Sequence, residues 1–175
     1  ELYTTVDGGE NWIEVDGNNI PNPLDGEYGY VRQIEVFEDN VWYTTNKGRI
    51  YHSTDKGFNW VVYNTNVTDF AGIRLSFANE NDGVYIDSSG AVYRSFNGGA
   101  SWQQIDTQGP IYTTDLSYAP NSNTIFTTGA SADGTGSSVS FDGGYNWTGI
   151  DVGTQHTAVQ FLDENTGWSG GFNYS

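Results

Sequence analysis

The chain has 175 residues, with 22 Asp and Glu against 6 Lys and Arg, and its formal net charge is −16. A surface this acidic is the opposite of the basic footprint of a nucleic-acid binder and is repelled by anionic membranes, so we expect neither partner. The absence of cysteine excludes disulfides and thiolate metal sites, and no apolar run reaches the roughly 18 to 20 residues of a membrane span, so we expect no membrane insertion.

The chain opens with half of a repeated unit. Residues 2–5 and 11–15 predict two short strands, joined by a turn that carries Asp, Gly and Trp, and together they predict a half unit over residues 1–16. A connector rich in Gly, Asn and Pro follows over residues 16–29, because these residues exclude a central strand.

The first complete unit spans about residues 31–64 and sets the pattern for the others. Its apolar and β-branched runs predict strands at 31–37, 41–45, 49–53 and 59–63, with the Asp-containing turn between the third and the fourth. Four short antiparallel strands in about 45 residues are typical of one β-propeller blade.

Two further units and a final half unit follow. They span about residues 72–107, 112–152 and 156–175. The third complete unit carries an insertion of small polar residues at 129–136, which predicts a mobile loop. The final half contains only the first two strands of the pattern.

The turn motif recurs four times, with tryptophans 42 to 48 residues apart, and a period of that size marks a repeated supersecondary unit. An Asp or Asn side chain accepts hydrogen bonds from main-chain N–H groups further along the turn, and glycine adopts positive φ without strain. We therefore assign the motif a structural role rather than a catalytic one. Its positions are Thr5, Asp7, Gly9 and Trp12; Ser53, Asp55, Gly57 and Trp60; Ser95, Asn97, Gly99 and Trp102; and Ser140, Asp142, Gly144 and Trp147.

These residues resemble the Asp-box, or BNR repeat, found in the β-propellers of sialidases, sortilin-like receptors and many secreted bacterial proteins. The resemblance implies an all-β propeller of four-stranded antiparallel blades, with Asp-box turns between the third and fourth strands. It implies fold more firmly than activity, because unlike functions share the motif. Two complementary half units would close a four-bladed ring, but family propellers usually have more blades, so we expect a segment of a longer propeller.

Candidate ligand-binding residues are few. Tyr28 and Tyr30 lie beside glycines and predict either a stacking platform for a sugar or peptide, or packing of the connector onto a blade edge. Arg32 and Arg74 are candidate ligand contacts, with surface or inter-blade ion pairs as the alternative. The few arginines do not supply the cluster that a sialidase needs.

Other chemistry has weaker support. Glu35 and Asp115, in or beside first strands, are the candidate carboxylates for a glycosidase, with channel-lining side chains as the alternative. Acidic turns offer oxygen ligands to calcium but lack the spacing of a calcium loop, so we expect no cofactor. His52 takes the place that Arg94 takes in the next unit, which predicts a solvent-facing polar position.

The sequence thus predicts a secreted or cell-surface module that binds a protein or glycan and lacks catalysis of its own. The alternative is part of a glycoside hydrolase of the Asp-box class. Residues 161–171 resemble the final repeats of secreted Bacteroidetes propellers, which implies type IX secretion and the outer-membrane export and attachment machinery as partners. A further resemblance, to the photosystem II assembly propeller, implies a basic patch that six dispersed basic residues do not supply.

Overall fold

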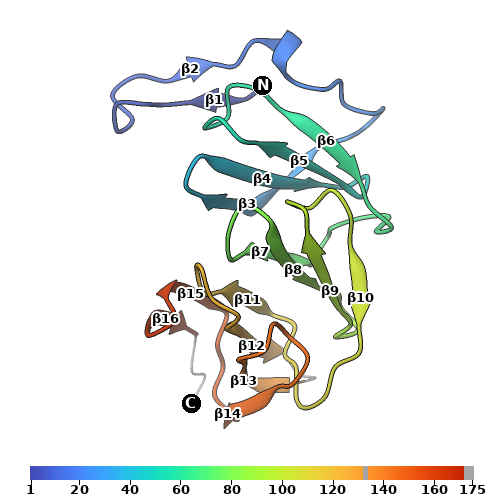
Figure 1. Cartoon of the computed structure of the whole chain (residues 1–175), viewed down its shortest axis with the longest axis vertical. Helices are drawn as coiled ribbons and strands as arrows, with labels where there is room; N and C mark the ends of the chain where they lie inside the picture. Colours follow the sequence, from blue (N-terminus) through green and yellow to red (C-terminus); the bar gives the residue numbers. More distant parts are fainter. Residues whose placement is uncertain (132–133, 172–175) are drawn as a thin grey trace. The chain divides into compact units, whose positions relative to one another are not determined.

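A computed structural model describes residues 1–131 and 134–171, without the side chains of Val31, Arg32 and Ser131. The described chain is all-β apart from one 3-10 turn, and its complete sheets each have four antiparallel strands (Figure 1). The predicted fold class is therefore confirmed. The chain divides into two compact units, Glu1–Ala71 and Gly72–Ser175, which we describe separately.

The first unit contains a two-stranded sheet, a short 3-10 helix in the connector and one complete four-stranded sheet of strand order β3-β4-β5-β6. Each strand pairs with its neighbour in sequence, so short hairpins make every connection within the sheet. The elements are β1 (Tyr3–Thr4), β2 (Ile13–Glu14), η1 (Gly17–Asn19), β3 (Gly29–Phe37), β4 (Asn40–Thr45), β5 (Arg49–Ser53) and β6 (Val61–Asn64).

The register of this sheet sorts its side chains onto two faces. Tyr43 lies opposite Tyr51, and Trp42 lies opposite His52. Because neighbouring residues of a strand point to opposite faces, the two tyrosines share one face, and the tryptophan and histidine share the other. The pairing of β3 with β4 is irregular between Gly29 and Ile34, so the first strand follows a bent path into the sheet.

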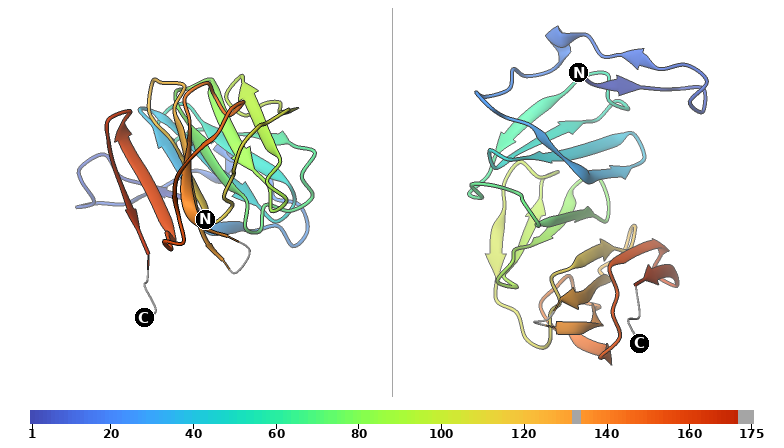
Figure 2. Two further views of the ribbon diagram at one scale, coloured as in Figure 1. Left: turned by 90° about the horizontal axis from the view of Figure 1, so that it is seen from below. Right: turned by 180° about the vertical axis from the view of Figure 1, so that it is seen from behind.

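The second unit contains two complete sheets and a final hairpin (Figure 2). Both complete sheets repeat the meander order of the first unit. The strands are β7 (Arg74–Phe77), β8 (Asp82–Ile86), β9 (Val92–Phe96), β10 (Gln103–Ile105), β11 (Asp115–Tyr118), β12 (Ile125–Ser131), β13 (Gly134–Ser140), β14 (Thr148–Val152), β15 (Ala158–Asp163) and β16 (Thr166–Gly170).

An apolar core joins the two complete sheets of the second unit. Aliphatic residues of β8 and β9 pack against β11, β12 and the tryptophan of the fourth Asp-box, so burial of these faces stabilises the stacking of one blade on the next. The core consists of Ala78, Val84, Ile86, Val92, Ile105, Leu116, Tyr118, Ile125 and Trp147.

The insertion at residues 129–136 differs from the expectation of a mobile loop. Gly129 pairs with Gly136, Ala130 with Thr135 and Ser131 with Gly134, so the described part of the insertion lengthens the β12–β13 hairpin. Small residues lower β-propensity, but the backbone ladder extends from the paired strands before it. The tip, residues 132–133, lies outside the described residues.

Two glycines on second strands make room for aromatic rings. A Cβ atom at Gly83 would lie 2.5 Å from the Phe77 ring, and one at Gly167 would lie 2.5 Å from the Phe161 ring. Each glycine is the cross-strand partner of the phenylalanine that covers it. The phenylalanine therefore lies flat on the sheet, an arrangement known to support strand glycines.

Candidate functional site

Three of the four Asp-boxes have the same pattern of hydrogen bonds within the turn. In the second copy, Ser53 Oγ donates to Asp55 Oδ1 and accepts from the Gly57 N–H, at 2.9 and 2.8 Å. Asp55 also accepts from Asn59, through the main-chain N–H to Oδ1 at 2.8 Å and the side-chain amide to Oδ2 at 2.7 Å. The first and fourth copies repeat these bonds through Asn11 and Asn146. The carboxylates are therefore fully engaged in holding the turn.

The third box reverses one hydrogen bond. Its Asn97 Oδ1 still accepts from the Ser101 N–H at 3.0 Å, but its Nδ2 donates to Ser101 Oγ at 2.9 Å. A carboxamide has a donor where a carboxylate has a second acceptor, so its partner must accept. Serine in place of the asparagine of the other copies meets that need.

Ionisation of the box aspartates follows from these contacts. Hydrogen bonds from the main chain and side chain of Asn11, and from Thr5, lower the pKa of Asp7 to about 2. Burial alone would raise the pKa of Asp55 and Asp142, but the bonds from their asparagine and serine partners outweigh it and lower both pKa values. These groups are charged at neutral pH and do not act as proton donors.

Each box turn contains two consecutive left-handed residues. Gly57 has φ 88° and Lys56 before it has φ 61°, whereas the other three copies carry glycine at both positions. Glycine adopts this conformation without a Cβ clash. Lys56 is held in it by its N–H, which donates to Asp39 O at 2.9 Å, and by its carbonyl, which accepts from Thr4 Oγ1 at 2.8 Å.

Two of the four box tryptophans pack against a stacked pair of tyrosines. In the first unit the Trp60 ring lies 5.2 Å from Tyr43, which stacks on Tyr51 at 4.7 Å. The same trio recurs in the second unit with Tyr85, Tyr93 and Trp102. The third sheet has Thr127 and Ser138 in place of the tyrosine pair.

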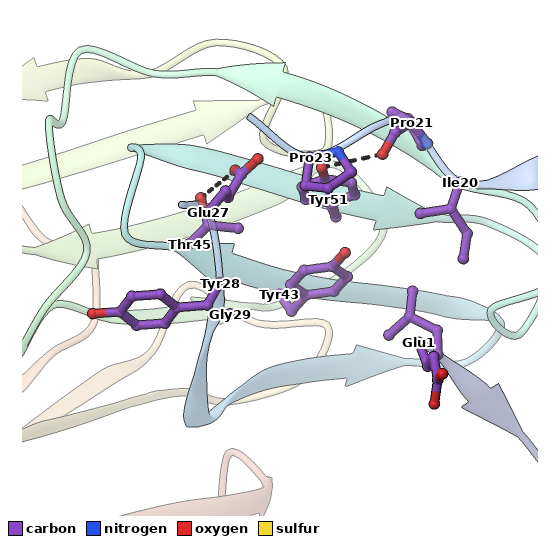
Figure 3. A pocket seen from close by; sticks show the side chains of 11 residues that line it. Glu1, Ile20, Pro21, Pro23, Glu27, Tyr28, Gly29, Tyr43, Thr45 and Tyr51 are labelled. Carbon is purple, nitrogen blue, oxygen red and sulfur yellow. Dashed lines mark hydrogen bonds between the residues drawn. The ribbon is translucent and has the colours of Figure 1, made fainter. Parts of the chain in front are cut away.

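In the first unit, the face that carries the tyrosines borders a cleft of about 390 Å³. Tyr28 forms its outer edge with 58 % of its surface exposed, and the rings of Tyr43 and Tyr51 line its floor near Pro21 and Pro23 (Figure 3). The connector and the start of the chain supply the rest of the wall. The lining residues are Glu1, Leu2, Ile20, Pro21, Pro23, Glu27, Tyr28, Gly29, Tyr43, Thr45 and Tyr51.

A buried ion pair fixes the connector against this cleft. Both carboxylate oxygens of Glu27 contact the Arg49 guanidinium, at 2.9 and 2.8 Å. Burial alone would raise the pKa of Glu27, but hydrogen bonds from the Leu24 N–H, the Thr45 hydroxyl and Arg49 lower it below its usual value. Arg49 also donates to the carbonyl of Asn22 at 3.1 Å and to the Tyr51 hydroxyl. The pair thereby ties the connector to β4 and β5.

The four predicted ligand contacts have different surroundings. Tyr28 lines the cleft. The Tyr30 ring makes an edge-to-face contact with the Tyr28 ring, with centroids 5.5 Å apart, and its hydroxyl donates to Asp69 Oδ1 at 2.6 Å. Arg74, in the second unit, lies 3.3 Å from Asp115 in an ion pair between β7 and β11. The side chain of Arg32 lies outside the described residues. Ligand binding by these residues stays a prediction.

The two candidate carboxylates do not form a described pair, because Glu35 belongs to the first unit and Asp115 to the second. Asp115 Oδ2 accepts from the Val159 N–H at 2.9 Å, and Oδ1 faces Arg74. Burial raises the pKa of Asp115 in spite of these contacts. Its role here is to join β11 to β15 and β7.

The solvent-facing position predicted for His52 is wrong. His52 is only 6 % exposed, stacks on Trp42 with ring centroids 4.6 Å apart, and pairs with Asn40 Oδ1 at 2.9 Å. Burial lowers its pKa to about 4. Arg94 at the equivalent place is buried too, and it donates to the carbonyl of Gly143 in the fourth box. This position alternates with the tyrosines along the strand, so its side chain lies on the opposite face of the sheet, and that face is also buried here.

Among residues 1–131 and 134–171, no group of three or more His, Asp or Glu side chains is arranged to hold a metal ion. The acidic turn at residues 79–82 uses its own oxygens, since Asn79 Oδ1 accepts from the N–H groups of Asn81 and Asp82 at 2.9 Å. No helix in this described part is long and apolar enough to cross a membrane.

Comparison with known proteins places these features in a family. A family model described as photosynthesis system II assembly factor YCF48 matches residues 2–133, well over half of the chain. The chain belongs to this family. The match confirms the resemblance to the assembly propeller, although six basic residues do not supply the basic patch that this resemblance implied.

Other relatives cover the chain in part. The vacuolar protein sorting/targeting protein 10 of Schizosaccharomyces japonicus is 28% identical over 127 residues, which is 60% of this chain and 8% of that protein. The structure of YCF48 bound to D1 peptide has a TM-score of 0.58 at 19% identity, covering 89% of this chain and 48% of that one. The structure of the GH74 enzyme of Niastella koreensis has a TM-score of 0.64 at 22% identity, and the match covers 90% of this chain and 22% of that one. The chain thus spans about half or less of these proteins, and the structures share its fold.

Sequence reasoning in this YCF48-family chain missed the cleft and the ion pair beneath it. Glu27 and Arg49 are 22 residues apart and follow no motif. A signal existed for the tyrosine stack, because Tyr43 and Tyr85 each precede the recurring Tyr51 and Tyr93 by eight residues. The asparagine before three of the four box tryptophans was a second unused signal.

Proposed function

We propose that this chain is a non-catalytic protein-binding module that holds an extended peptide segment in the tyrosine cleft of its first unit. The observation that carries the proposal is the cleft itself, in which an exposed Tyr28 stands beside a floor of stacked tyrosines. Aromatic faces bind apolar peptide side chains and proline rings, and they lose little conformational entropy on binding.

Preorganisation favours this reading. The Glu27–Arg49 pair and the hydrogen bond that the Tyr28 N–H donates to Asn46 Oδ1, at 2.8 Å, hold the connector in place before any ligand arrives. A site ordered in advance avoids the entropic cost of ordering loops on binding. The Asp-box carboxylates and Asp115 are hydrogen-bonded or ion-paired within the protein, so they do not form a general acid–base pair. This supports binding without catalysis.

Family membership supports a protein ligand over a glycan. One structure of the same fold is YCF48 with a bound D1 peptide, so a propeller of this family accommodates a peptide. Our proposal takes only this chemical class, an extended peptide, to the present chain.

A selection experiment tests the proposal. Random twelve-residue peptides displayed on phage are selected on the protein, and the Kd of each recovered peptide is measured for the wild type and for Tyr28→Ala. We expect roughly tenfold weaker binding by Tyr28→Ala, as for a typical aromatic contact. Tyr145→Ala, which truncates an exposed tyrosine in the second unit, is the matched control and should bind like the wild type. Equal affinity of the wild type and both variants would exclude the cleft as the site of peptide binding.

We also propose that the chain functions outside the cytoplasm, as a secreted or cell-surface protein exported by type IX machinery. The support is compositional, namely 23 Gly and 27 aromatic residues, together with the resemblance of residues 161–171 to secreted propellers. Proteinase treatment of intact source cells should degrade the surface-bound protein while a cytoplasmic marker survives. Full protection of the chain, with none in the medium, would contradict this location.

A further inference from the structure

A second cleft, of about 250 Å³, lies in the second unit between the β11–β14 sheet and the β15–β16 hairpin. Its walls are largely apolar, and its Trp168 is 63 % exposed. The Val159 N–H donates to Asp115 and the Phe161 N–H donates to Ser117, at 2.9 and 3.0 Å, so the hairpin is fixed against the sheet. The apolar walls are Phe126, Ile150, Val159, Phe161 and Trp168.

A row of polar side chains crosses the floor of this cleft. Thr128 lies opposite Ser137, and Ser137 lies opposite Asp151, on three adjacent strands. Directly opposed side chains of neighbouring strands lie about 5 Å apart on one face. Thr128 also pairs with Asp115, whose side chain faces β15. The whole row therefore points toward the hairpin.

His156 completes the polar group. Its Nδ1 lies 2.8 Å from Ser169 Oγ, and its Nε2 lies 3.3 Å from Asp151 Oδ2. Ser137 Oγ donates to the same Oδ2. Because Nε2 faces a carboxylate oxygen, it carries the proton, and Nδ1 accepts from the Ser169 hydroxyl.

Unsatisfied polar atoms concentrate in this cleft. Among the described residues, two buried oxygen atoms of its lining have no hydrogen-bond partner: Thr128 Oγ1 and Asp151 Oδ1. Thr128 is only 1 % exposed. Buried polar groups in proteins are nearly always paired, so two unpaired oxygens in one cleft indicate a ligand that satisfies them.

We propose that this cleft binds a primary ammonium group, the side chain of a lysine on a protein partner. Both unpaired oxygens accept hydrogen bonds, and an ammonium group has three donors and no acceptor. The Asp151 carboxylate supplies the opposite charge, while Phe161 and Trp168 can cover the aliphatic stem. The net charge of −16 steers a basic partner toward the molecule.

The test uses three probes and calorimetric titration of the whole chain: acetyl-Gly-Lys-Gly-amide, the same peptide with an Nε-acetylated lysine, and n-butylamine. We expect the charged peptide to bind and the acetylated peptide to bind at least roughly tenfold more weakly, because acetylation removes the charge and two donors. Equal binding of both peptides, or binding of neither, would overturn the proposal. If butylamine binds as tightly as the charged peptide, the ligand is a free amine, and the proposal of a protein partner is overturned.

Two variants separate the cleft from general electrostatics. Asp151→Asn should weaken binding of the charged peptide roughly 10- to 100-fold, while Asp106→Asn, the same charge change at an exposed site in the same unit, should not. An equal loss of affinity in both variants would show that net charge, and not the cleft, causes the effect, and would overturn the proposal. Thr128→Val keeps the shape and removes the unpaired hydroxyl, so it should weaken binding without lowering the urea midpoint. Unchanged binding by Thr128→Val would contradict the role of the Thr128 hydroxyl as an acceptor for the ammonium group.

Discussion

At the scale of single residues, the Asp-box is a hydrogen-bond pattern in which donors and acceptors must match. Asp55 requires a donating partner at position 59, and Asn97 requires an accepting partner at position 101. The sequence predicted the turn from Asp, Gly and Trp, but not this pairing, because the partner lies four residues away and had no role in the motif as first defined.

This pairing predicts energetic coupling in the third box. Asn97→Ala and Ser101→Ala each remove one partner of the bond from Asn97 Nδ2 to Ser101 Oγ, so the double variant should cost less than the sum of the two single variants. We expect a coupling free energy of about 1 kcal/mol, the value of one hydrogen bond. A double-mutant cycle in urea unfolding measures it. Strict additivity of the two changes would mean that the reversed bond is energetically irrelevant.

Lys56 predicts a stabilising substitution. Its φ of 61° is in the left-handed region, where the other three boxes have glycine, so Lys56→Gly should raise the free energy of unfolding by about 1 kcal/mol relative to Lys56→Ala. The alanine variant is the control because it removes the ion pair with Asp39 but keeps the Cβ atom. An alanine variant as stable as the glycine variant would exclude backbone strain as the cause.

At the scale of strands and sheets, repetition made prediction effective. The third strand expected at residues 49–53 is observed as Arg49–Ser53, whereas the fourth, expected at 59–63, is Val61–Asn64. The difference arises because the Trp60 N–H donates to the carbonyl of Asn19 in the connector, at 2.9 Å, and the ladder with β5 begins at Val61. His52 was assigned to the wrong face because a polar residue in a strand usually faces solvent, and its burial depends on stacking against Trp42.

The glycine on the second strand of a blade should resist substitution. Gly83→Ala would place a methyl group 2.5 Å from the Phe77 ring, so the ring must shift, and we expect a loss of roughly 1–3 kcal/mol. Gly149→Ala, where the nearest atom is Pro110 Cγ at 3.6 Å, should change stability by less than about 0.5 kcal/mol. Chemical denaturation compares the two, and equal losses would refute the role of the ring.

Burial of His52 predicts a specific pH dependence. Its folded pKa of about 4 lies below the ordinary value of about 6.5, so the unfolded chain binds more protons between these values. Stability should therefore fall as pH decreases from 6.5 to 4, by at most about 1.4 kcal/mol per pH unit. His52→Gln should remove this slope, while His156→Gln should retain it. A slope unchanged by His52→Gln would assign it to other groups.

At the scale of the whole molecule, the repeats predicted an all-β propeller fold of Asp-box type, and the sheets and the family confirm that fold class. Neither cleft could be predicted, because each brings together residues from different elements without a local pattern. Glu27 meets Arg49 only after the connector folds back onto β5, and Asp151 meets His156 only after the final hairpin docks. The residues that line each cleft thus come together through tertiary contacts that the repeat leaves free to vary.

Hydrogen–deuterium exchange of the protein with a phage-selected peptide tests the peptide-binding account most directly. We expect the peptide to slow exchange in the connector around residues 20–29 and in strands β4 and β5, and to leave the second unit unchanged. Protection confined to the second unit, or no protection at saturating peptide, would contradict binding in the tyrosine cleft.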